Sequence, residues 1–358
     1  MPSSNRATAH GAPRAFAVVL VAALAWATRA EAQLKPDGFS AERLYQSAPG
    51  GGWVAMDDLS MRGGLGGAMA ISLGYAHNPL KIATSDGSQR LPVISDQAFT
   101  DFGLAITYNR WRLYLDMNMP LVINGQSGRV GAYQLSGPSV GVGSNPDTLA
   151  DARIGLDARI LGGPASPFRL GAGAQLFLPN GKRAEYDTDD TFRAMLRVLF
   201  AGDVGLVTYA GHVGVHVRPL DDSPIPGSPQ GSELLFGVAA GPRVIVGSRA
   251  VTALVVGPEL YGETAFRSFF GTTATGLEGL LSGRLEGIGD DGPQLRVKLG
   301  AGGGISPHFG APEWRVVFGL ELFDHSTDRD KDGITDGKDA CPDTRGIKTD
   351  DPKTNGCP

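Results

Sequence analysis

The segment Ala150-Asp-Ala-Arg-Ile-Gly-Leu-Asp-Ala-Arg-Ile160 places apolar and charged residues at alternate positions. In an extended chain successive side chains point to opposite faces, so this alternation separates the two kinds of residue, whereas helical spacing would mix them. One face would carry Ala152, Ile154, Leu156, Ala158 and Ile160. The other face would carry Asp151, Arg153, Asp157 and Arg159. The segment is therefore predicted to be a β-strand with one apolar and one polar face.

The same two-residue period recurs from Gly63 onward, with turn residues between successive segments. We find about twelve such segments, in the range of roughly 9–11 residues or slightly more that a tilted membrane strand needs. They lie near 64–76, 98–109, 111–119, 149–161, 168–178, 191–201, 206–218, 232–246, 250–261, 273–287, 294–305 and 313–323. An even number of strands is typical of single-chain bacterial outer-membrane barrels.

The connections between these segments alternate in length. About one residue separates the second segment from the third at Asn109-Arg110, and the joins near 162–164 and 290–292 are also short. The connections after the first, third, fifth, seventh and ninth segments run to about ten to thirty residues, although the last one, at 306–312, is short. Outer-membrane barrels have short periplasmic turns and longer outside loops, so both ends of the barrel are expected to face the periplasm. A soluble β-sandwich gives no reason for this alternation.

The predicted fold is all-β: a transmembrane antiparallel up-and-down β-barrel of about 12 strands over residues 63–325, followed by a short irregular calcium-binding repeat at 326–358. A secretory signal peptide is expected at 1–32, because basic residues precede an apolar run from Ala15 to Ala27 and Ala30-Glu-Ala32 is a small-x-small cleavage site. Residues 33–62 are expected to form a polar, partly ordered leader segment. The expected location is the outer membrane of a Gram-negative bacterium, with the C-terminal tail in the periplasm.

In a barrel surrounded by lipid the apolar faces point outward and the charged faces point into the lumen. The predicted lumen charges and histidines are Arg153, Asp157, Arg159, Arg193, Arg197, His212, His216, Arg218, Arg243, Glu259, Glu278, Arg284, Glu286, Arg296, Lys298 and Glu321. These groups could line an open pore, or they could pair across a lumen of intermediate width and plug it. Both alternatives remain open at this stage. His212 and His216 share one strand face and could bind a metal, although filling of a polar lumen explains them as well.

The segment Asp328-Arg-Asp-Lys-Asp-Gly-Ile-Thr-Asp-Gly-Lys-Asp339 has the ligand spacing of a twelve-residue calcium loop. Acidic residues stand at positions 1, 3, 5, 9 and 12, and the glycine at position 6 permits the sharp turn. The predicted Ca²⁺ ligands are the side chains of Asp328, Asp330, Asp332, Asp336 and Asp339 and the carbonyl oxygen of Ile334. No amphipathic helix flanks the loop, so a structural calcium site is expected instead of a switch. The alternative is a solvated acidic linker.

Cys341 and Cys357 are the two cysteines of the chain. In an exported protein they are expected to form a disulfide, which would stabilise the tail by roughly 3 kcal/mol in the loop-entropy model. Two free thiols are the alternative. Too few hydrophobic residues lie between the cysteines to form a core, so calcium and the disulfide would together have to replace one.

The composition excludes some classes of function. The chain has 32 basic against 37 acidic residues, and this balance argues against nucleic-acid binding, which needs clustered positive charge. No G-x-S-x-G, H-E-x-x-H or phosphate-loop motif is present. We therefore expect a protein that is not an enzyme.

The acidic spacing from Asp328 to Asp339, followed by Cys341-Pro342, resembles a thrombospondin type 3 repeat, and the segment 351–358 resembles its bacterial continuation. A signal peptide, a barrel and this repeat together resemble OmpA-family outer-membrane proteins, particularly the large ones of myxobacteria and their relatives. In that family the repeats usually lead into a C-terminal domain that binds peptidoglycan. The sequence here stops at Pro358, so peptidoglycan binding is expected only if a further C-terminal domain exists.

The sequence thus predicts a non-enzymatic outer-membrane β-barrel, porin-like or structural, with a calcium-stabilised periplasmic linker. The expected partners are outer-membrane lipid and small solutes in the lumen, with no nucleic acid. The alternative is a secreted or surface calcium-dependent adhesion module built on a soluble β-sandwich.

Overall fold

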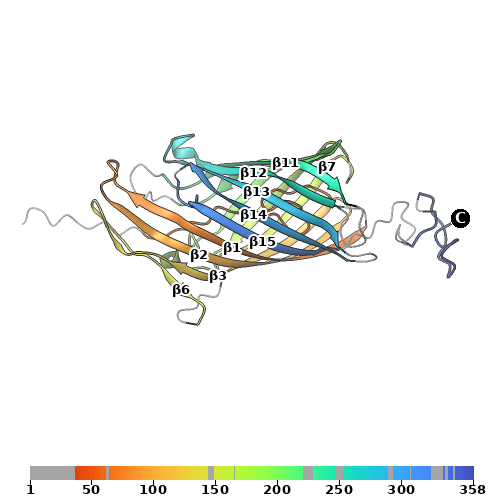
Figure 1. Cartoon of the computed structure of the whole chain (residues 1–358), viewed down its shortest axis with the longest axis horizontal. Helices are drawn as coiled ribbons and strands as arrows, with labels where there is room; N and C mark the ends of the chain where they lie inside the picture. The colour runs from red at the N-terminus through yellow and green to blue at the C-terminus, as the bar shows by residue number, and fades with distance from the viewer. Residues whose placement is uncertain are drawn as a thin grey trace, which may run out of the picture.

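Twelve long antiparallel strands close into a barrel (Figure 1). The computed structural model describes residues 37–358 except 62–63, 144–148, 165, 221–228, 247–252, 289–292, 307, 324–333, 335–337 and 342. The barrel strands are β1 (Leu65–Ala83), β2 (Arg90–Tyr108), β3 (Trp111–Asn124), β7 (Ala152–Leu161), β8 (Arg169–Leu178), β9 (Arg193–Val204), β10 (Val207–Val217), β11 (Glu233–Ile245), β12 (Ala253–Ala265), β13 (Thr275–Ile288), β14 (Gln294–Ser306) and β15 (Trp314–Phe323). The predicted all-β barrel and its strand number are confirmed.

Neighbouring strands follow the order of the chain, and the barrel closes where β1 pairs with both β2 and β15. The β1–β15 register runs from Ala68 opposite Phe323 to His77 opposite Trp314. Closure matters physically, because an open sheet edge in hydrocarbon would leave backbone groups without hydrogen-bond partners. We call the end with the β2–β3 and β9–β10 turns the turn end, and the opposite end the loop end.

Three short strands and two short 3-10 helices decorate the loop end. β4 (Gly128–Val130) pairs with β5 (Tyr133–Leu135), and β6 (Ser139–Gly141) pairs with the end of β3. The 3-10 helices are η1 (Arg183–Glu185) and η2 (Phe266–Ser268). No helix in the described part of the chain is long and apolar enough to cross a membrane.

One expected connection is wrong. The sequence suggested a long loop after the first segment, but β1 and β2 are each 19 residues long and continue almost to a tight turn at 84–89. The reason is a cluster of buried apolar side chains at the loop end, in which Leu80, Val93 and Ile94 pack with Ile123. The hairpin therefore extends as strand because its tip has a core of its own to pack against.

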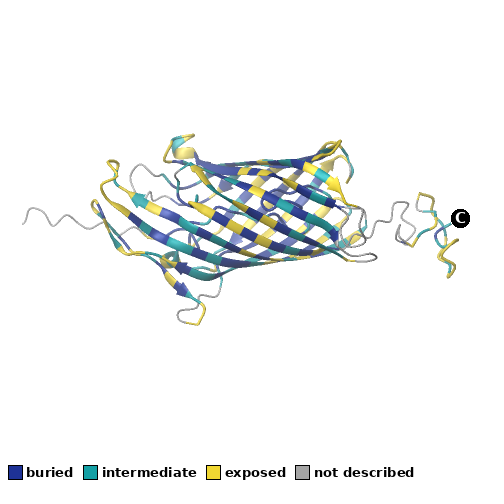
Figure 2. Ribbon diagram, in the orientation of Figure 1, coloured by how far each residue is buried: buried dark blue, intermediate teal, exposed yellow. Residues whose placement is uncertain are grey.

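Along the barrel strands, exposed residues that face outward alternate with buried residues that face the lumen, as the banding of Figure 2 shows. On β9, Leu196 and Val198 are 60% and 53% exposed, whereas Met195 and Leu199 are 1% and 0% exposed. Exposed aromatic side chains gather at both ends of the wall. Tyr108, Trp111 and Phe168 lie at the turn end, and Phe192, Phe266, Phe269, Phe270 and Trp314 lie at the loop end. An apolar band between two aromatic girdles is the surface that a membrane barrel presents to lipid.

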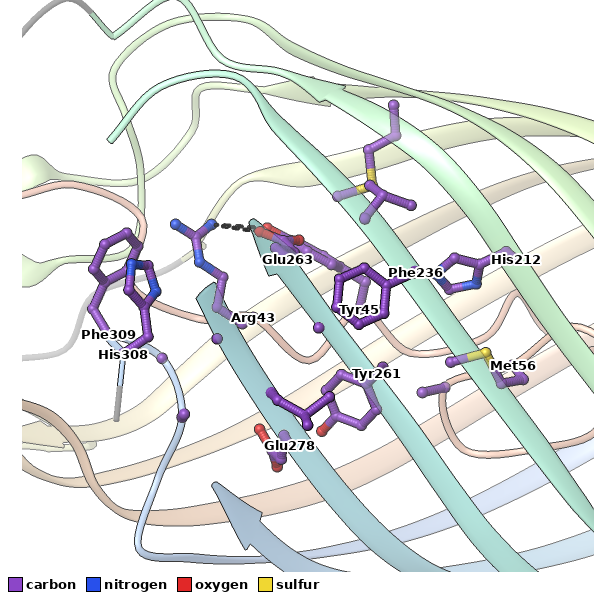
Figure 3. A pocket seen from close by; sticks show the side chains of 18 of the residues that line it. Arg43, Tyr45, Met56, His212, Phe236, Tyr261, Glu263, Glu278, His308 and Phe309 are labelled. Atoms are coloured by element: carbon purple, nitrogen blue, oxygen red, sulfur yellow. Dashed lines mark hydrogen bonds and ion pairs between the residues drawn. The ribbon is translucent and has the colours of Figure 1, made fainter. Parts of the chain in front are cut away.

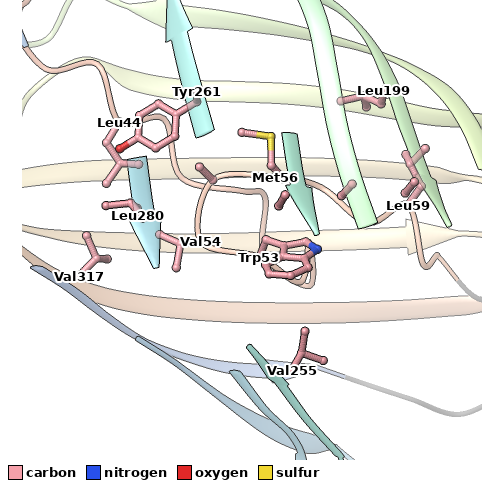
Figure 4. Close-up of a cluster of buried hydrophobic side chains, with 14 of the residues drawn as sticks. Leu44, Trp53, Val54, Met56, Leu59, Leu199, Val255, Tyr261, Leu280 and Val317 are labelled. Carbon is pink, nitrogen blue, oxygen red and sulfur yellow. The ribbon is translucent and has the colours of Figure 1, made fainter. Parts of the chain in front are cut away.

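Residues 37–61, which we call the lumen segment, run through the interior of the barrel. Near the loop end the ring of Phe39 lies 4.9 Å from that of Phe309. Further along, Trp53, Val54, Met56 and Leu59 pack against apolar side chains of the wall (Figure 4). Those wall side chains are Phe99, Leu199, Ala201, Ala210, Ala239, Val255, Tyr261, Leu280 and Val317. The core of this protein is therefore the lumen itself, and the polar leader expected from the sequence is instead a largely buried segment.

Candidate functional site

The lumen segment has little regular structure, so its backbone polar groups need partners from elsewhere. Charged side chains of the wall supply many of them. Glu259 accepts hydrogen bonds from the backbone N–H groups of Val54 and Ala55, both at 2.8 Å. Basic side chains donate to carbonyl oxygens in the pairs Arg153 to Gln46, Arg159 to Leu59 and Met61, Arg169 to Asp58, and Lys298 to Trp53. The predicted lumen charges thus hold a peptide segment in place.

Four buried charges join the lumen segment to three wall strands. Asp57 Oδ1 lies 2.7 Å from Arg112 Nη2, and Asp57 Oδ2 lies 3.3 Å from Arg197 Nη1. The same two guanidinium groups contact Asp157, at 2.7 and 3.3 Å. Two arginines therefore balance two aspartates, and all four side chains are at most 4% exposed. This arrangement is fully paired, which is the condition under which buried charges are tolerated.

A second ionic cluster anchors the segment near the loop end. Asp189, from the connection between β8 and β9, accepts a hydrogen bond from Ser40 N at 2.8 Å and two from Arg218 at 2.7 Å. Burial alone would raise the pKa of Asp189, but the charge and hydrogen bonds of Arg218 lower this pKa well below its ordinary value. Asp189 is therefore a permanent anion that fixes the start of the lumen segment.

A compact turn lets the segment reverse inside the barrel. Gly51 N donates to Ala48 O at 2.7 Å, and Asp58 N donates to Gly51 O at 2.7 Å. Gly52 has φ +97°, which favours glycine, and a Cβ atom there would lie 2.4 Å from Asp58 Oδ2. A Cβ atom at Gly51 would likewise lie 2.5 Å from Asp57 Oδ1, so larger residues would not fit at Gly51 and Gly52.

The lumen keeps some free volume around the segment. A cavity of about 310 Å³ opens at the turn end, between Asp58 of the segment and wall residues Arg169, Arg284, Glu286 and Arg296. Two smaller cavities of about 70 and 40 Å³ lie toward the loop end. Since a water molecule occupies roughly 30 Å³ in the liquid, the smaller cavities hold only one or a few waters. Of these three cavities, the widest therefore lies at the turn end and the two small ones lie toward the loop end.

Figure 3 shows the smallest of these three cavities, with Arg43 and Tyr45 of the lumen segment facing Tyr261, Glu263 and Glu278 of the wall. His308, from the connection between β14 and β15, closes one side. Burial, together with the nearby charge of Arg43, lowers the pKa of His308 to about 4. The His308 ring is consequently neutral at physiological pH.

The histidines predicted to share a face separate into two environments. His216 is fully buried and lies 3.7 Å from Glu233 and 3.8 Å from Glu263, measured from His216 Nδ1 to the nearest carboxylate oxygens. His212 lines the cavity of Figure 3 next to Met56 and does not belong to this cluster. The sequence reasoning missed Glu233 and Glu263 because they come from neighbouring strands. Both glutamates stand at inward-facing positions in the two-residue alternation of their strands, and this pattern could have identified them.

The predicted calcium loop lies mostly outside the described residues, which include only Ile334 and Asp339 of its six ligands. Ile334 is buried, and Asp339 Oδ1 accepts a hydrogen bond from Cys341 N at 2.7 Å. Asp339 Oδ2 is buried and has no hydrogen-bond partner among the described residues. The expected disulfide joins Cys341 and Cys357, whose Cα atoms are 5.0 Å apart.

Comparisons with known proteins give distant structural similarities. No protein-family model matches the chain, and no curated protein sequence matches it. Among solved structures, an outer membrane channel from Pseudomonas putida aligns with TM-score 0.46 and 12% identity, over 73% of this chain and 96% of that one. The outer membrane protein opdK from Pseudomonas aeruginosa aligns with TM-score 0.28 and 10% identity, over 72% and 98% of the two chains. These similarities are too weak to assign a function, so the function is argued from the chain's own geometry.

Proposed function

We propose that this protein is an outer-membrane channel whose lumen is closed by its own residues 37–61, and that solutes pass only when this lumen segment moves. The observation that supports this proposal most directly is that the segment fills the interior and is held by hydrogen bonds and ion pairs from the wall. No part of this proposal requires a catalytic step.

The wall supports a membrane location. Its strands close completely, its outward side chains are apolar, and aromatic residues stand at both ends. A soluble barrel of this kind would expose a very large apolar surface to water, which soluble monomers avoid. The turn end, with its short connections, then faces the periplasm, and the loop end faces outward.

The filled lumen is consistent with a channel that is closed by its own segment. A twelve-stranded barrel lies between the small barrels that side chains alone can fill and the large ones that leave an aqueous channel. Its lumen is thus wide enough to hold a peptide, and moving that peptide would leave a passage. The wall of this passage would carry Arg112, Asp157, Arg197, Glu259 and Lys298, which would favour small polar or charged solutes. Arg112, Arg197, Glu259 and Lys298 now contact the lumen segment directly, and Asp157 pairs with the first two of them.

The C-terminal tail fits a calcium-stabilised spacer on the periplasmic side. Its support is the ligand spacing from Asp328 to Asp339, the partnerless buried oxygen of Asp339, and the disulfide that follows. A structural calcium site and a disulfide would together keep a short segment with little core folded.

Planar-bilayer conductance tests the channel. The full chain is expected to show rare or no stable conductance steps, whereas a variant lacking residues 37–61 is expected to show stable steps in most insertions. Folding of both proteins is checked by the mobility shift between boiled and unboiled samples in detergent gels. If the deletion variant is folded and still silent, the barrel has a structural role and the channel proposal fails.

A further inference from the structure

Three side chains of the inner wall converge near the loop end. They are His216 on β10, Glu233 on β11 and Glu263 on β12. In the sheet His216 pairs directly with Glu233, and Leu235, two residues along, pairs with Glu263. One ligand-type atom from each residue lies within 4.8 Å of the other two. Each of these three adjacent strands therefore points one of the side chains into the lumen, and together they form a cluster of one imidazole and two carboxylates.

The atoms that face one another in this cluster lack partners. His216 is fully buried, and neither of its ring nitrogens has a hydrogen-bond partner in the described structure. The same holds for Glu233 Oε2, which lies 3.7 Å from His216 Nδ1, and for Glu263 Oε1, at 3.8 Å. Polar atoms that are buried and unsatisfied are costly, so a buried group of three such side chains indicates something that binds between them.

Neighbouring groups hold the two carboxylates in this orientation. Arg43 of the lumen segment lies 3.4 Å from Glu233 Oε1 and 3.5 Å from Glu263 Oε2. Arg218 adds a contact of 3.1 Å to Glu233 Oε1. Each carboxylate thus turns one oxygen to a guanidinium group and the other toward His216. Supporting partners that orient ligands in this way are typical of metal sites.

The charged groups around the cluster have a net negative charge. The carboxylates of Glu233, Glu263, Asp189 and Asp151 face the guanidinium groups of Arg43, Arg218 and Arg193, which leaves one negative charge in excess. Of the three side chains, Glu263 also lines the cavity of about 40 Å³ shown in Figure 3. A bound divalent ion would neutralise this excess, leaving one net positive charge on the group, and it would give the ring nitrogen of His216 that faces the carboxylates a partner.

We propose that His216, Glu233 and Glu263 form a binding site for a divalent transition-metal ion, with Zn²⁺ as the first candidate. Imidazole suits zinc, iron, copper and nickel, whereas Ca²⁺ and Mg²⁺ prefer oxygen ligands alone. Three protein ligands leave a fourth position of tetrahedral zinc for water. The site is distinct from the calcium loop of the tail, and it does not depend on whether the lumen opens.

Zinc titration of the purified, folded protein tests the proposal. The full chain is stripped with a chelator, saturated with Ca²⁺ to fill the tail site, and titrated with Zn²⁺ by calorimetry. One Zn²⁺ is expected to bind per chain, and Co²⁺ is expected to give the visible absorption of a low-symmetry site. His216→Phe, whose ring can stay between Tyr45 and Phe177, and Glu263→Gln are each expected to weaken binding by more than about tenfold, because loss of even an outer-shell partner costs that much.

His212→Phe is the matched control, since it removes a histidine from the same face of β10 outside the cluster. Folding of each variant is checked by gel mobility before and after boiling. The proposal is overturned if the folded wild-type chain binds no Zn²⁺, in which case the two carboxylates share a proton instead. It is also overturned if the His216→Phe and His212→Phe variants bind Zn²⁺ equally, which would identify an adventitious site elsewhere.

Discussion

Replacement of Asp57 by alanine is expected to release the lumen segment and produce frequent channel openings. Asp57 is the segment's contribution to the four-charge cluster, and it also accepts a hydrogen bond from Ala48 N at 3.1 Å. Without Asp57, the buried guanidinium groups of Arg112 and Arg197 would share Asp157 alone. Removing one partner from a buried ion pair costs roughly 3–5 kcal/mol. At about 1.4 kcal/mol per tenfold change, the ratio of closed to open states should fall by about two to nearly four orders of magnitude.

The measurement is the open probability of single channels in a planar bilayer, with protease sensitivity of the lumen segment as a second readout. Asp86→Ala is the matched control, because Asp86 lies in the exposed turn between β1 and β2 and should leave the channel closed. The double variant Asp57→Ala with Arg112→Met restores the charge balance, leaving one arginine and one aspartate, and should recover part of the closure. An Asp57→Ala protein as silent as the Asp86→Ala control would show that this cluster does not hold the segment.

The second large effect is expected in the C-terminal tail. Chelation of calcium combined with reduction of the Cys341–Cys357 disulfide should unfold residues 326–358, because this segment has little core of its own and the disulfide contributes about 3 kcal/mol in the loop-entropy model. The barrel should stay folded under the same conditions, since its strands do not involve the tail. Limited proteolysis followed by mass spectrometry would locate the cleavage, and heat-modified gel mobility would report on the barrel.

Calcium binding itself provides the specific control. The double variant Asp330→Asn with Asp332→Asn should abolish binding of one Ca²⁺ measured by calorimetry, and its tail should be cleaved even in calcium. Asp350→Asn, which changes a carboxylate of the tail outside the loop, should leave both properties unchanged. A tail equally resistant to protease with and without calcium would argue for a linker that the disulfide alone stabilises.

Much of the wall could be predicted from the sequence because each strand carries its own two-residue period. The segment 150–160 is an example: Ala152–Leu161 is strand β7, with Ile154 and Leu156 exposed and Asp157 and Arg159 buried. The strand number followed from counting such periods. The extent of β1 and β2 did not, because their tips pack against side chains that are distant in sequence, such as Ile123.

The lumen segment was not predicted, although two signals pointed to it. Its residues Trp53, Val54, Met56 and Leu59 are too apolar for a solvated leader. The second signal lies on β9, where the face that carries Arg193 and Arg197 also carries Met195 and Leu199. An apolar belt inside a wide lumen needs a partner, and only the tertiary structure shows that the partner is this irregular segment. The histidine–carboxylate cluster was hidden for the same reason, because it requires the register of three strands.

The most direct test of the central claim, that residues 37–61 occupy and close the lumen, is a disulfide between the segment and the wall. A Cβ atom at Gly300 on β14 would lie 3.2 Å from Cγ2 and 3.8 Å from Cγ1 of Val54, so cysteines at both positions would have adjacent side chains, which a disulfide requires. In the folded Asp57→Ala, Val54→Cys, Gly300→Cys protein we predict spontaneous cross-linking and bilayers that stay silent until a reductant restores the openings expected of Asp57→Ala. Wild-type protein treated with the same reductant controls for the Cys341–Cys357 bond. Two free thiols in the folded barrel, or full conductance in the cross-linked protein, would contradict the account.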